Sequence, residues 1–474
     1  MLKNDTKKHP TLLRIIFYIF ELFPLGFLLI LLQFAKLFAK DEVIVNRISK
    51  ISRKLLDKKS PHRIFLYRII NEVHPNIRKA LFFNLIYRSN YRVFLNRFYG
   101  QKDTNIIKKF IVDDLFHSLY TNLPNLHTIQ KDNNINIPWL ILIDPTTSCN
   151  LNCTGCWSAG YGDHYRLNRK TLDRIIMQSK DLGIYLFLFT GGEPLIEKKN
   201  LIHLSNKHND AFFFSFTNGY YINSAFIDEI KVNGNFIPII SIEGNEEETD
   251  FRRGSGAYSK AIQAMRLLKQ NNIPFGFSIC CHAHNVESVV NEQFIKFLEE
   301  CGAFFGFFFM YVPIGSDASK DFMLDASQRK FMLDNIIKIR KECSLLIIDF
   351  WHDAEHVGGC IAGGRKYFHI NAKGDCEPCA FVHYSNVNIH NSTILDALKS
   401  PLFSEYKLNH PFNDNHLMPC PMTDNPSILN NMVVTAKAKS THMNGVENVD
   451  SLTKKFTKSS IEWEEIVKKE PYKR

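Results

Sequence analysis

The chain has 474 residues, which exceeds the size at which a single hydrophobic core keeps growing, so we expect one large domain with additional segments. Apolar residues make up 45% of the sequence, a proportion that excludes wholesale disorder. The formal net charge of +10 is unevenly distributed: residues 1–138 carry 23 Lys and Arg against 10 Asp and Glu, whereas the remainder is nearly neutral. The basic character of residues 1–138 indicates an anionic partner for these residues alone, either a membrane surface or a nucleic acid.

Residues 1–40 are predicted to be a hydrophobic membrane segment. Ile15 to Ala35 forms an apolar run of 21 residues, close to the ~20 that span a bilayer. Glu21 and Pro24 interrupt it, so a spanning helix, a kinked helix lying in the interface and a buried helix of a soluble protein all stay open. Lys and Arg are denser after the run than before it, which predicts that the bulk of the protein lies on the cytoplasmic face of the membrane. We therefore expect membrane lipids, and no nucleic acid, as the anionic partner.

Residues 41–135 are predicted to be a basic helical region, because large apolar residues mix with Arg at helical spacing. From residue 136 onward, short apolar runs alternate with amphipathic stretches, as in a parallel sheet covered by helices on both faces. We predict an α/β fold, a partial (β/α)6 barrel over 136–350, with its chemistry at the carboxyl ends of the strands. The expected strands cover 139–144, 185–190, 212–217, 237–243, 275–280 and 304–310, and a strand-like stretch follows at 345–351.

Eleven cysteines are many for a chain expected in a reducing compartment, where disulfides are rare, so clustered cysteines indicate metal ligation. Cys149, Cys153 and Cys156 form a C-x3-C-x2-C triplet just after the first expected strand. Three thiolates on a four-iron cube leave one iron open to a small molecule. A structural zinc site would need a fourth ligand, which could come from elsewhere in the chain.

With this triplet the chain resembles the radical S-adenosylmethionine (SAM) superfamily. The resemblance implies a [4Fe–4S] cluster on Cys149, Cys153 and Cys156 whose open iron binds SAM. It also implies a reductase, ferredoxin or flavodoxin as electron donor, and a 5′-deoxyadenosyl radical that abstracts hydrogen from a substrate. The family commonly has an aromatic residue just before the third cysteine, near the adenine. Here that position is Gly155, and Trp157 follows the cysteine instead.

The resemblance continues at later strand ends, where it implies the SAM contacts. TGGEP (190–194) is similar to the family's GGEP motif, and SFTNG (215–219) offers polar groups to ribose or carboxylate. SIEGNEEETDFRRG (241–254) has Glu where the family has Asp; its second Arg is the expected partner of the SAM carboxylate, and Arg252 is expected to be a surface charge. MYVPIG (310–315) resembles the backbone segment that recognises adenine in relatives. The implied cofactor-binding residues are Gly191, Gly192, Glu193, Ser215, Thr217, Asn218, Glu243 and Arg253.

A second cysteine group lies in residues 351–430, which are rich in Gly, Cys, Asn and Pro. Its C-x13-G-x4-C spacing resembles the opening of the auxiliary-cluster domains called SPASM or twitch domains. The resemblance implies one further Fe–S cluster on Cys360, Cys379 and Cys420, with Cys376 either a fourth ligand or an incidental cysteine on a turn. Zinc in place of this cluster stays open. Residues 431–474 are expected to be a polar, partly disordered tail.

The remaining cysteines have apolar neighbours and are expected to be core thiols, although one of the pair that closes the fifth strand could face the barrel. These are Cys280, Cys281, Cys301 and Cys343. His352, Asp353 and His356 lie near the next strand end, as structural residues or as substrate contacts.

Three functions are compatible with these features. The first is a membrane-associated enzyme acting on a small molecule or lipid, prompted by the apolar N-terminus and 39 Phe. The second is a peptide-modifying maturase, since many family members with such C-terminal cluster domains act on peptides, although no peptide-binding winged-helix domain is evident at the N-terminus. The third is a membrane-tethered Fe–S electron carrier, against which the GGEP motif and Arg253 argue because a carrier needs no SAM site.

Overall fold

The computed structural model describes residues 123–158, 164–315, 318–442 and 447–469, all within one compact unit of the chain (88–474). The expected membrane segment and most of the expected basic region lie outside these residues. Of the basic region, only the end is described, and it includes the helix α9 (Leu123–Asn133). Among the helices in the described ranges, none has the length and apolar character needed to cross a bilayer.

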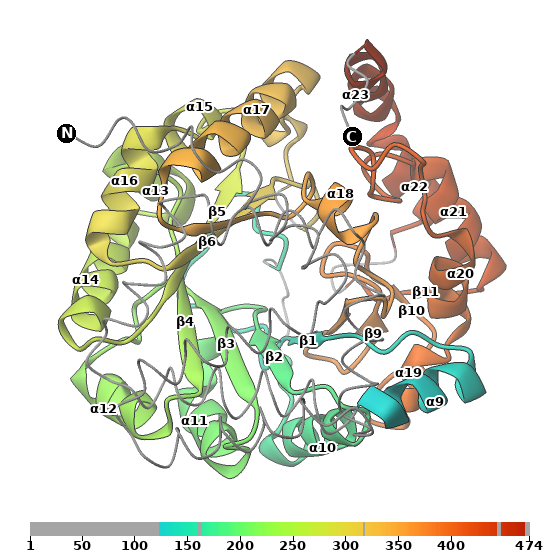
Figure 1. Ribbon diagram of the computed structural model, residues 1–474, viewed down its shortest axis with the longest axis horizontal. Helices are drawn as coiled ribbons and strands as arrows, with labels where there is room; N and C mark the ends of the chain where they lie inside the picture. The colour runs from blue at the N-terminus through green and yellow to red at the C-terminus, as the bar shows by residue number, and fades with distance from the viewer. Residues whose placement is uncertain (1–122, 159–163, 316–317, 443–446, 470–474) are drawn as a thin grey trace, which may run out of the picture. The chain divides into compact units, whose positions relative to one another are not determined.

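One curled sheet organises the described residues (Figure 1). Its first seven strands lie side by side in chain order and are all parallel, each within one or two residues of the expected bounds. The α/β half-barrel predicted from the sequence is confirmed, with a seventh strand beyond the six-unit barrel. The strands are β1 (Leu140–Ile143), β2 (Leu186–Phe189), β3 (Phe212–Thr217), β4 (Phe236–Ser241), β5 (Gly276–Cys281), β6 (Phe305–Met310) and β7 (Leu346–Asp349).

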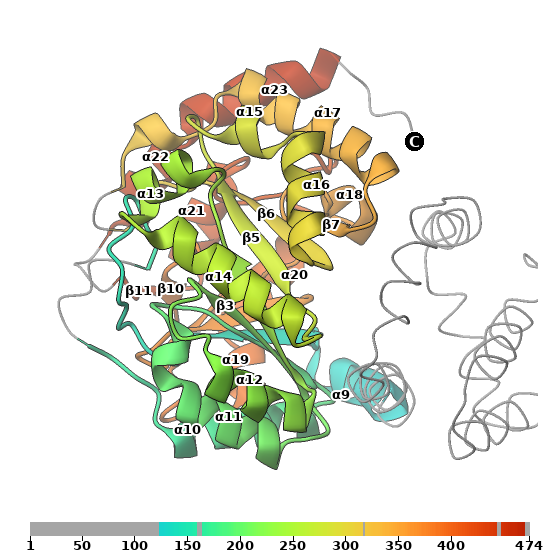
Figure 2. The same ribbon diagram turned by 90° about the vertical axis from the view of Figure 1, so that its left-hand side faces the viewer.

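Helices follow the strands and cover the outer face of the sheet (Figure 2). Several begin at Asn or Asp side chains that accept a backbone N–H of the first turn, as Asn168, Asn223 and Asp325 do. The helical segments of the barrel are α10 (Arg169–Asp181), η2 (Pro194–Glu197), α11 (Lys198–Lys207), α12 (Ser224–Asn233), α13 (Glu246–Arg253), α14 (Ala257–Gln270), α15 (Val286–Val289), α16 (Glu292–Cys301), η3 (Lys320–Phe322) and α17 (Ala326–Glu342).

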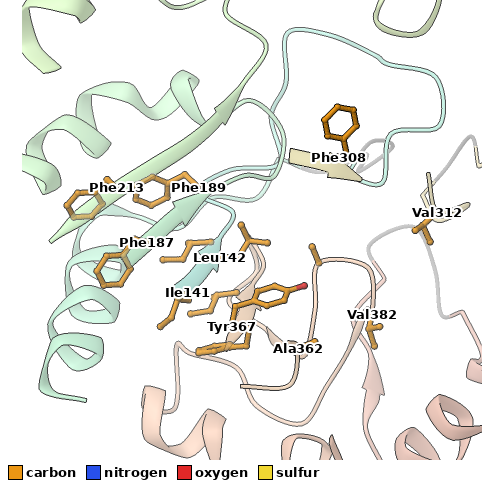
Figure 3. Packing of buried hydrophobic residues seen from close by; sticks show 14 of the residues in the cluster. Ile141, Leu142, Phe187, Phe189, Phe213, Phe308, Val312, Ala362, Tyr367 and Val382 are labelled. Atoms are coloured by element: carbon orange, nitrogen blue, oxygen red, sulfur yellow. The ribbon is translucent and has the colours of Figure 1, made fainter. Parts of the chain in front are cut away.

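Phenylalanines form the core between the sheet and its outer helices. Phe187 and Phe189 of β2 both stack on Phe213 of β3, with ring centroids 5.5 and 5.9 Å apart (Figure 3). All three side chains are fully buried. A buried Phe contributes about 1.5–3 kcal/mol by leaving water, so this layer holds the parallel strands against their helices.

A second set of Phe side chains alternates with the first along the same strands and packs together as half-buried rings. Phe216 of β3 meets Phe307 and Phe309 of β6 edge-to-face, each at 5.8 Å, and Phe309 in turn lies 5.2 Å from Phe350. Because successive side chains of a strand point to opposite faces, these rings belong to the inner face of the half-barrel. Packing between strands therefore accounts for the Phe-rich sequence.

The region expected as a separate auxiliary domain (351–430) contributes to the main sheet. Its strand β8 (Tyr367–Ile370) pairs in parallel with β1, and β9 (Cys376–Glu377) pairs antiparallel with β8. Figure 3 shows Tyr367 beside Ile141 and Leu142 of β1. The remaining elements are α18 (Ala354–Val357), β10 (Tyr384–Ser385), α19 (Ile394–Leu398), α20 (Pro401–Asn409), α21 (Pro426–Thr435), β11 (Lys439–Ser440), α22 (Val449–Lys454) and α23 (Thr457–Lys469).

The C-terminal segment differs from the partly disordered tail expected for it. Over 447–469 it folds into α22 and α23, and the Trp463 side chain is only 1% exposed. Arg329 of α17 lies over the Trp463 ring at 4.2 Å, and Trp463 Nε1 donates to the Leu417 carbonyl at 2.8 Å. Trp463 and Val467 are the buried residues that anchor this largely polar helix, and a composition average conceals them.

Candidate functional site: two cysteine groups at a half-barrel

The loop after β1 carries the cysteine triplet. The Cys156 N–H donates to the Cys153 carbonyl at 3.1 Å, and the Leu151 N–H donates to Cys149 Sγ at 3.4 Å. The Thr154 N–H donates to the Arg252 carbonyl at 2.8 Å, which ties the loop to the end of α13. Backbone N–H groups that face sulfur suit a thiolate bound to iron, whose properties such bonds tune.

The first two residues of GGEP position this loop. The Gly192 N–H donates to the Thr146 carbonyl at 3.0 Å, and the Ser158 hydroxyl donates to the Gly191 carbonyl at 2.5 Å. Any Cβ at Gly192 would collide with the Ser148 carbonyl, and one at Gly191 would lie 2.7 Å from the Thr146 carbonyl. Because the two glycines lack side chains, the loop after β2 can contact the backbone that leads into Cys149. This contact adds to the close backbone approach to a ligand that the sequence predicts.

Glu193 lies fully buried between two strand ends. Its Oε1 accepts from the Thr217 hydroxyl at 2.8 Å and from the Leu195 N–H at 3.0 Å, while Oε2 accepts from the Asn218 N–H at 2.8 Å. Burial raises the pKa of Glu193 to about 7 even though these bonds and Arg253 oppose the shift. A cation arriving beside this carboxylate would restore its charge, which fits the ammonium expected there.

The third strand end contributes unequally to the site. Thr217 and Asn218 both reach Glu193, and the Asn218 side-chain amide also donates to Asn150 in the cysteine loop at 2.9 Å. Ser215 is completely buried within β3, where its hydroxyl donates to the Phe216 carbonyl at 3.2 Å. The structure therefore brings two of these three predicted residues to the cysteine loop and leaves Ser215 in the strand.

Glu243 binds two guanidinium groups. Its Oε1 accepts from Arg252 Nη1 at 2.6 Å and from Arg253 Nε at 2.8 Å, and Oε2 accepts from the Cys280 N–H at 3.1 Å. Although burial opposes ionisation, the two guanidinium groups hold the pKa of Glu243 below its ordinary value. The expectation that Arg252 is a surface charge is wrong, because this ion pair buries it to 6% exposure.

The charges at this corner match an anionic cluster. Burial raises the pKa of the Cys153 thiol, and the nearby charges of Arg253 and Arg252 act in the opposite direction. At Cys153, two guanidinium groups against the one carboxylate of Glu243 leave net positive charge. Buried cysteines become thiolates when such charge and a bound metal stabilise them. The donor set and its surroundings therefore fit an iron–sulfur cluster.

The auxiliary cysteines Cys360, Cys379 and Cys420 lie close enough to one another to interact electrically. The Tyr367 hydroxyl donates to Cys379 Sγ at 2.9 Å, and the Met422 and Thr423 N–H groups each donate to Cys420 Sγ at 3.4 Å. Burial raises the pKa of Cys379 to about 12. These sulfur-directed bonds among half-buried thiols again fit iron ligation.

The predicted fourth ligand, Cys376, stands apart from that trio. It is buried in β9, and the charges that act on its thiol are those of Asp375 and Glu377. The described residues contain no three His, Cys, Asp or Glu side chains placed to share a single metal ion. In a [4Fe–4S] cluster each thiolate binds a different iron, so the cysteine sulfur atoms do not meet at one point.

A buried ionic network joins the two regions. His369 of β8 lies between Asp144, which follows β1, at 3.0 Å, and Glu377 of β9 at 2.7 Å. Although burial lowers it, these two carboxylates raise the pKa of His369 to about 10. Sequence reasoning missed this His because its partners lie far along the chain from one another.

The other predicted candidates have structural partners. His352 Nδ1 bonds Asp349 at 2.7 Å and its Nε2 accepts from Arg329 Nε at 3.2 Å, while Asp353 pairs with Arg340 at 2.7 Å. His356 follows in the short helix α18.

Of the strand-end thiols, Cys281 is fully buried, whereas Cys280 is half-buried and pairs in register with the inner-face residue Phe309. Cys301 and Cys343 are half-buried against the core.

The curled parallel sheet carries a cysteine loop after its first strand and glycine, carboxylate and guanidinium groups at the next strand ends. This arrangement defines the class as a radical SAM half-barrel. Residues 143–298 match the model of the Radical SAM superfamily. The chain is a radical SAM enzyme that uses a [4Fe–4S] cluster with SAM, and its SPASM-type homologues carry additional Fe–S clusters.

Its relatives are distant. The AdoMet-dependent heme synthase of Methanosarcina barkeri is 24% identical over 203 residues, 42% of this chain but only 57% of that protein's length. The PqqA peptide cyclase of Granulibacter bethesdensis is 22% identical over 295 residues, 58% of this chain and 73% of that protein. SuiB of Streptococcus suis, crystallised with its precursor peptide SuiA, shares the fold with a TM-score of 0.52 at 18% identity, over 65% of this chain and 76% of SuiB.

Proposed function

We propose that this enzyme cleaves SAM reductively at Cys149, Cys153 and Cys156 and uses the resulting radical to modify a peptide. The observation that carries the first part is the seating of the cysteine loop against GGEP and α13, which places Glu193 and Arg253 beside the triplet. When bound, the cluster supplies one electron to the SAM sulfonium, which releases methionine and a 5′-deoxyadenosyl radical.

The chain's own residues bind and orient SAM. Glu193 Oε2 carries one backbone bond and has capacity for the SAM ammonium, since a carboxylate oxygen accepts more than one donor. Arg253 faces Glu243 through Nε and Nη2, and its guanidinium carries further donors for the SAM carboxylate. Its side chain is 14% exposed against 6% for Arg252, so Arg253 is the more accessible of the two.

A peptide is the substrate class that two of these similar proteins favour. One relative is named for cyclising the peptide PqqA, and the SuiB structure contains a precursor peptide. The lipid alternative depended on the apolar N-terminus, outside the described residues, and on the Phe-rich strands. Packing within the half-barrel accounts for those strands without a lipid, as the contacts of Phe216 with Phe307 and Phe309 illustrate.

Anaerobic reconstitution tests the chemistry. The purified enzyme, given iron, sulfide, SAM and a strong reductant, is expected to form 5′-deoxyadenosine, and a Cys153→Ala variant is expected to form none. An intact, reducible cluster that leaves SAM uncleaved would instead favour an electron carrier.

Substrate class is tested in cells of the native host that carry either the wild-type enzyme or Cys153→Ala. A peptide whose mass differs between the two strains would support the proposal. Identical peptides together with altered lipids would overturn it in favour of the lipid reading.

A further inference from the structure

A cleft lies among the three C-terminal helices, apart from the strand ends that surround the cysteine triplet. The helices α21, α22 and α23 follow one another at the end of the described chain (Figure 1). Together with the segment 413–425 they line a cavity of about 530 Å³, a volume within the range of about 300–1,000 Å³ that ligand sites occupy. None of the predicted cofactor-binding residues lines this C-terminal cleft, so it is a separate site.

One wall of the C-terminal cleft is the turn that carries Cys420. The Asn425 side-chain amide donates to the Met418 carbonyl at 2.8 Å and to the Cys420 carbonyl at 3.1 Å. The Cys420 N–H in turn donates to Asp424 Oδ2 at 3.0 Å. From α23, the Ser460 hydroxyl donates to the Asp424 carbonyl at 3.0 Å. These bonds connect the turn to the helix α23, so the shape of the cleft is determined before a ligand binds.

The charged side chains that line the cleft already have partners of opposite charge. The pairs are Asp450–Lys454, Glu464–Lys468 and Asp424–Arg329, at 2.6, 2.8 and 2.6 Å. The lining therefore offers no unpaired charge to an ionic ligand, and it favours a ligand that is uncharged where it binds.

Neutral hydrogen-bonding groups line the cleft from two helices. On α21, Ser427, Asn430 and Asn431 share one face, because residues three and four apart are neighbours on a helix. On α23, Thr457 and Ile461 share a face in the same way, and the Ile461 side chain is 51% exposed. An Asn side chain carries both donors and an acceptor, as a peptide group does. The lining thus combines amide and hydroxyl groups with an exposed apolar contact.

We propose that the C-terminal cleft binds an extended segment of the peptide substrate, away from the residue that the radical attacks. The main chain of an extended peptide is uncharged and presents N–H and C=O groups that match the Asn430 and Asn431 amides, while its side chains can contact Ile461. The inference rests on the proposed peptide substrate and adds the surface that recognises it. A segment bound here takes no part in hydrogen abstraction, so it affects KM rather than kcat.

Site-specific photo-crosslinking in the native host identifies the occupant. A benzophenone amino acid placed at Asn431 of the full-length enzyme is expected to capture a host peptide whose mass differs between strains with the wild-type enzyme and with Cys153→Ala. The same amino acid placed at Val232 of α12, which is 85% exposed, is the control and should not capture that peptide. Capture at Asn431 of a second copy of this chain, of a peptide with the same mass in both strains, or of no peptide would overturn the proposal.

Steady-state kinetics with a synthetic copy of the captured peptide test the contacts. The double variant Ser427→Ala/Asn431→Ala is expected to raise KM by about tenfold, the scale of two neutral hydrogen bonds. Both side chains are exposed on a helix, where Ala is well tolerated. Gln263→Ala removes an exposed amide from α14 and should behave as wild type. An unchanged KM, or a loss confined to kcat, would overturn the proposal. SAM cleavage by the wild type and the comparison of peptide masses are measured independently, so the proposed function can stand if this site fails.

Discussion

The two cysteine groups share a ligand type but differ in their surroundings. The core triplet lies in a loop where Cys149 is exposed, beside the charged groups of Glu193, Glu243 and Arg253. The auxiliary trio lies against the buried tyrosines Tyr367 and Tyr406 and receives hydrogen bonds at its sulfur atoms. A loop with an exposed thiol and nearby charges can admit an ionic cosubstrate, whereas thiols that lie against buried tyrosines suit a cluster that stores or passes electrons.

Exchanging one ligand in each group gives the largest expected effects. Cys153→Ala should lose the core cluster and all SAM cleavage while keeping auxiliary iron. Cys379→Ala should lose auxiliary iron while keeping the EPR change that SAM causes at the core cluster. Iron and sulfide analysis with EPR measures both. If either substitution removed both clusters from a folded protein, the two sites would not be independent.

The charged character of the core site predicts a pH dependence of intermediate size. Because burial raises the pKa of Glu193 to about 7, the carboxylate needed by the SAM ammonium is lost as pH falls through that value. SAM affinity is expected to drop by about tenfold per pH unit below the pKa. In the SAM-free protein, at any pH between the ordinary pKa of Glu and the raised pKa of Glu193, the folded state keeps the Glu193 proton and the unfolded state has lost it. The free energy of unfolding therefore falls as pH rises across this window.

Glu193→Gln is the matched control for this titration. It keeps the shape of the side chain, removes its charge, and should bind SAM weakly with no pH dependence around neutrality. Equilibrium binding of SAM to the reconstituted wild type and variant between about pH 6 and 8 measures the difference. A wild-type affinity that is flat across this range would show that Glu193 does not hold the ammonium.

The sequence allows most of the barrel to be predicted because its features are local. Apolar runs that alternate with amphipathic stretches locate β1 to β7. The cysteine spacing and GGEP are likewise short, contiguous signals. β8 escaped prediction because it contains His369 and is flanked by Lys366 and Asn371, so it forms no clear apolar run, and only pairing with β1 makes it a strand.

Features that depend on distant partners could not be predicted. Arg252 has the sequence context of a surface charge on an acidic helix, and only the buried Glu243 shows otherwise. Tyr311 and Gly155 are more than 150 residues apart, so the close packing of this ring on the cysteine loop cannot be read from sequence spacing. The fold determines both pairs through the strand ends that it brings together.

The smallest expected effect concerns Cys376, which sequence spacing made a candidate ligand. Its thiol is buried in β9 near Asp375 and Glu377, apart from the other three auxiliary cysteines. Cys376→Ala should therefore leave auxiliary iron and its EPR signal unchanged and lower the unfolding free energy by about 1 kcal/mol, the scale of a small core cavity. Cys281→Ala, another fully buried strand thiol, should behave alike. Loss of auxiliary iron in Cys376→Ala to the extent seen with Cys379→Ala would instead make Cys376 the fourth ligand and close that cluster to exogenous groups.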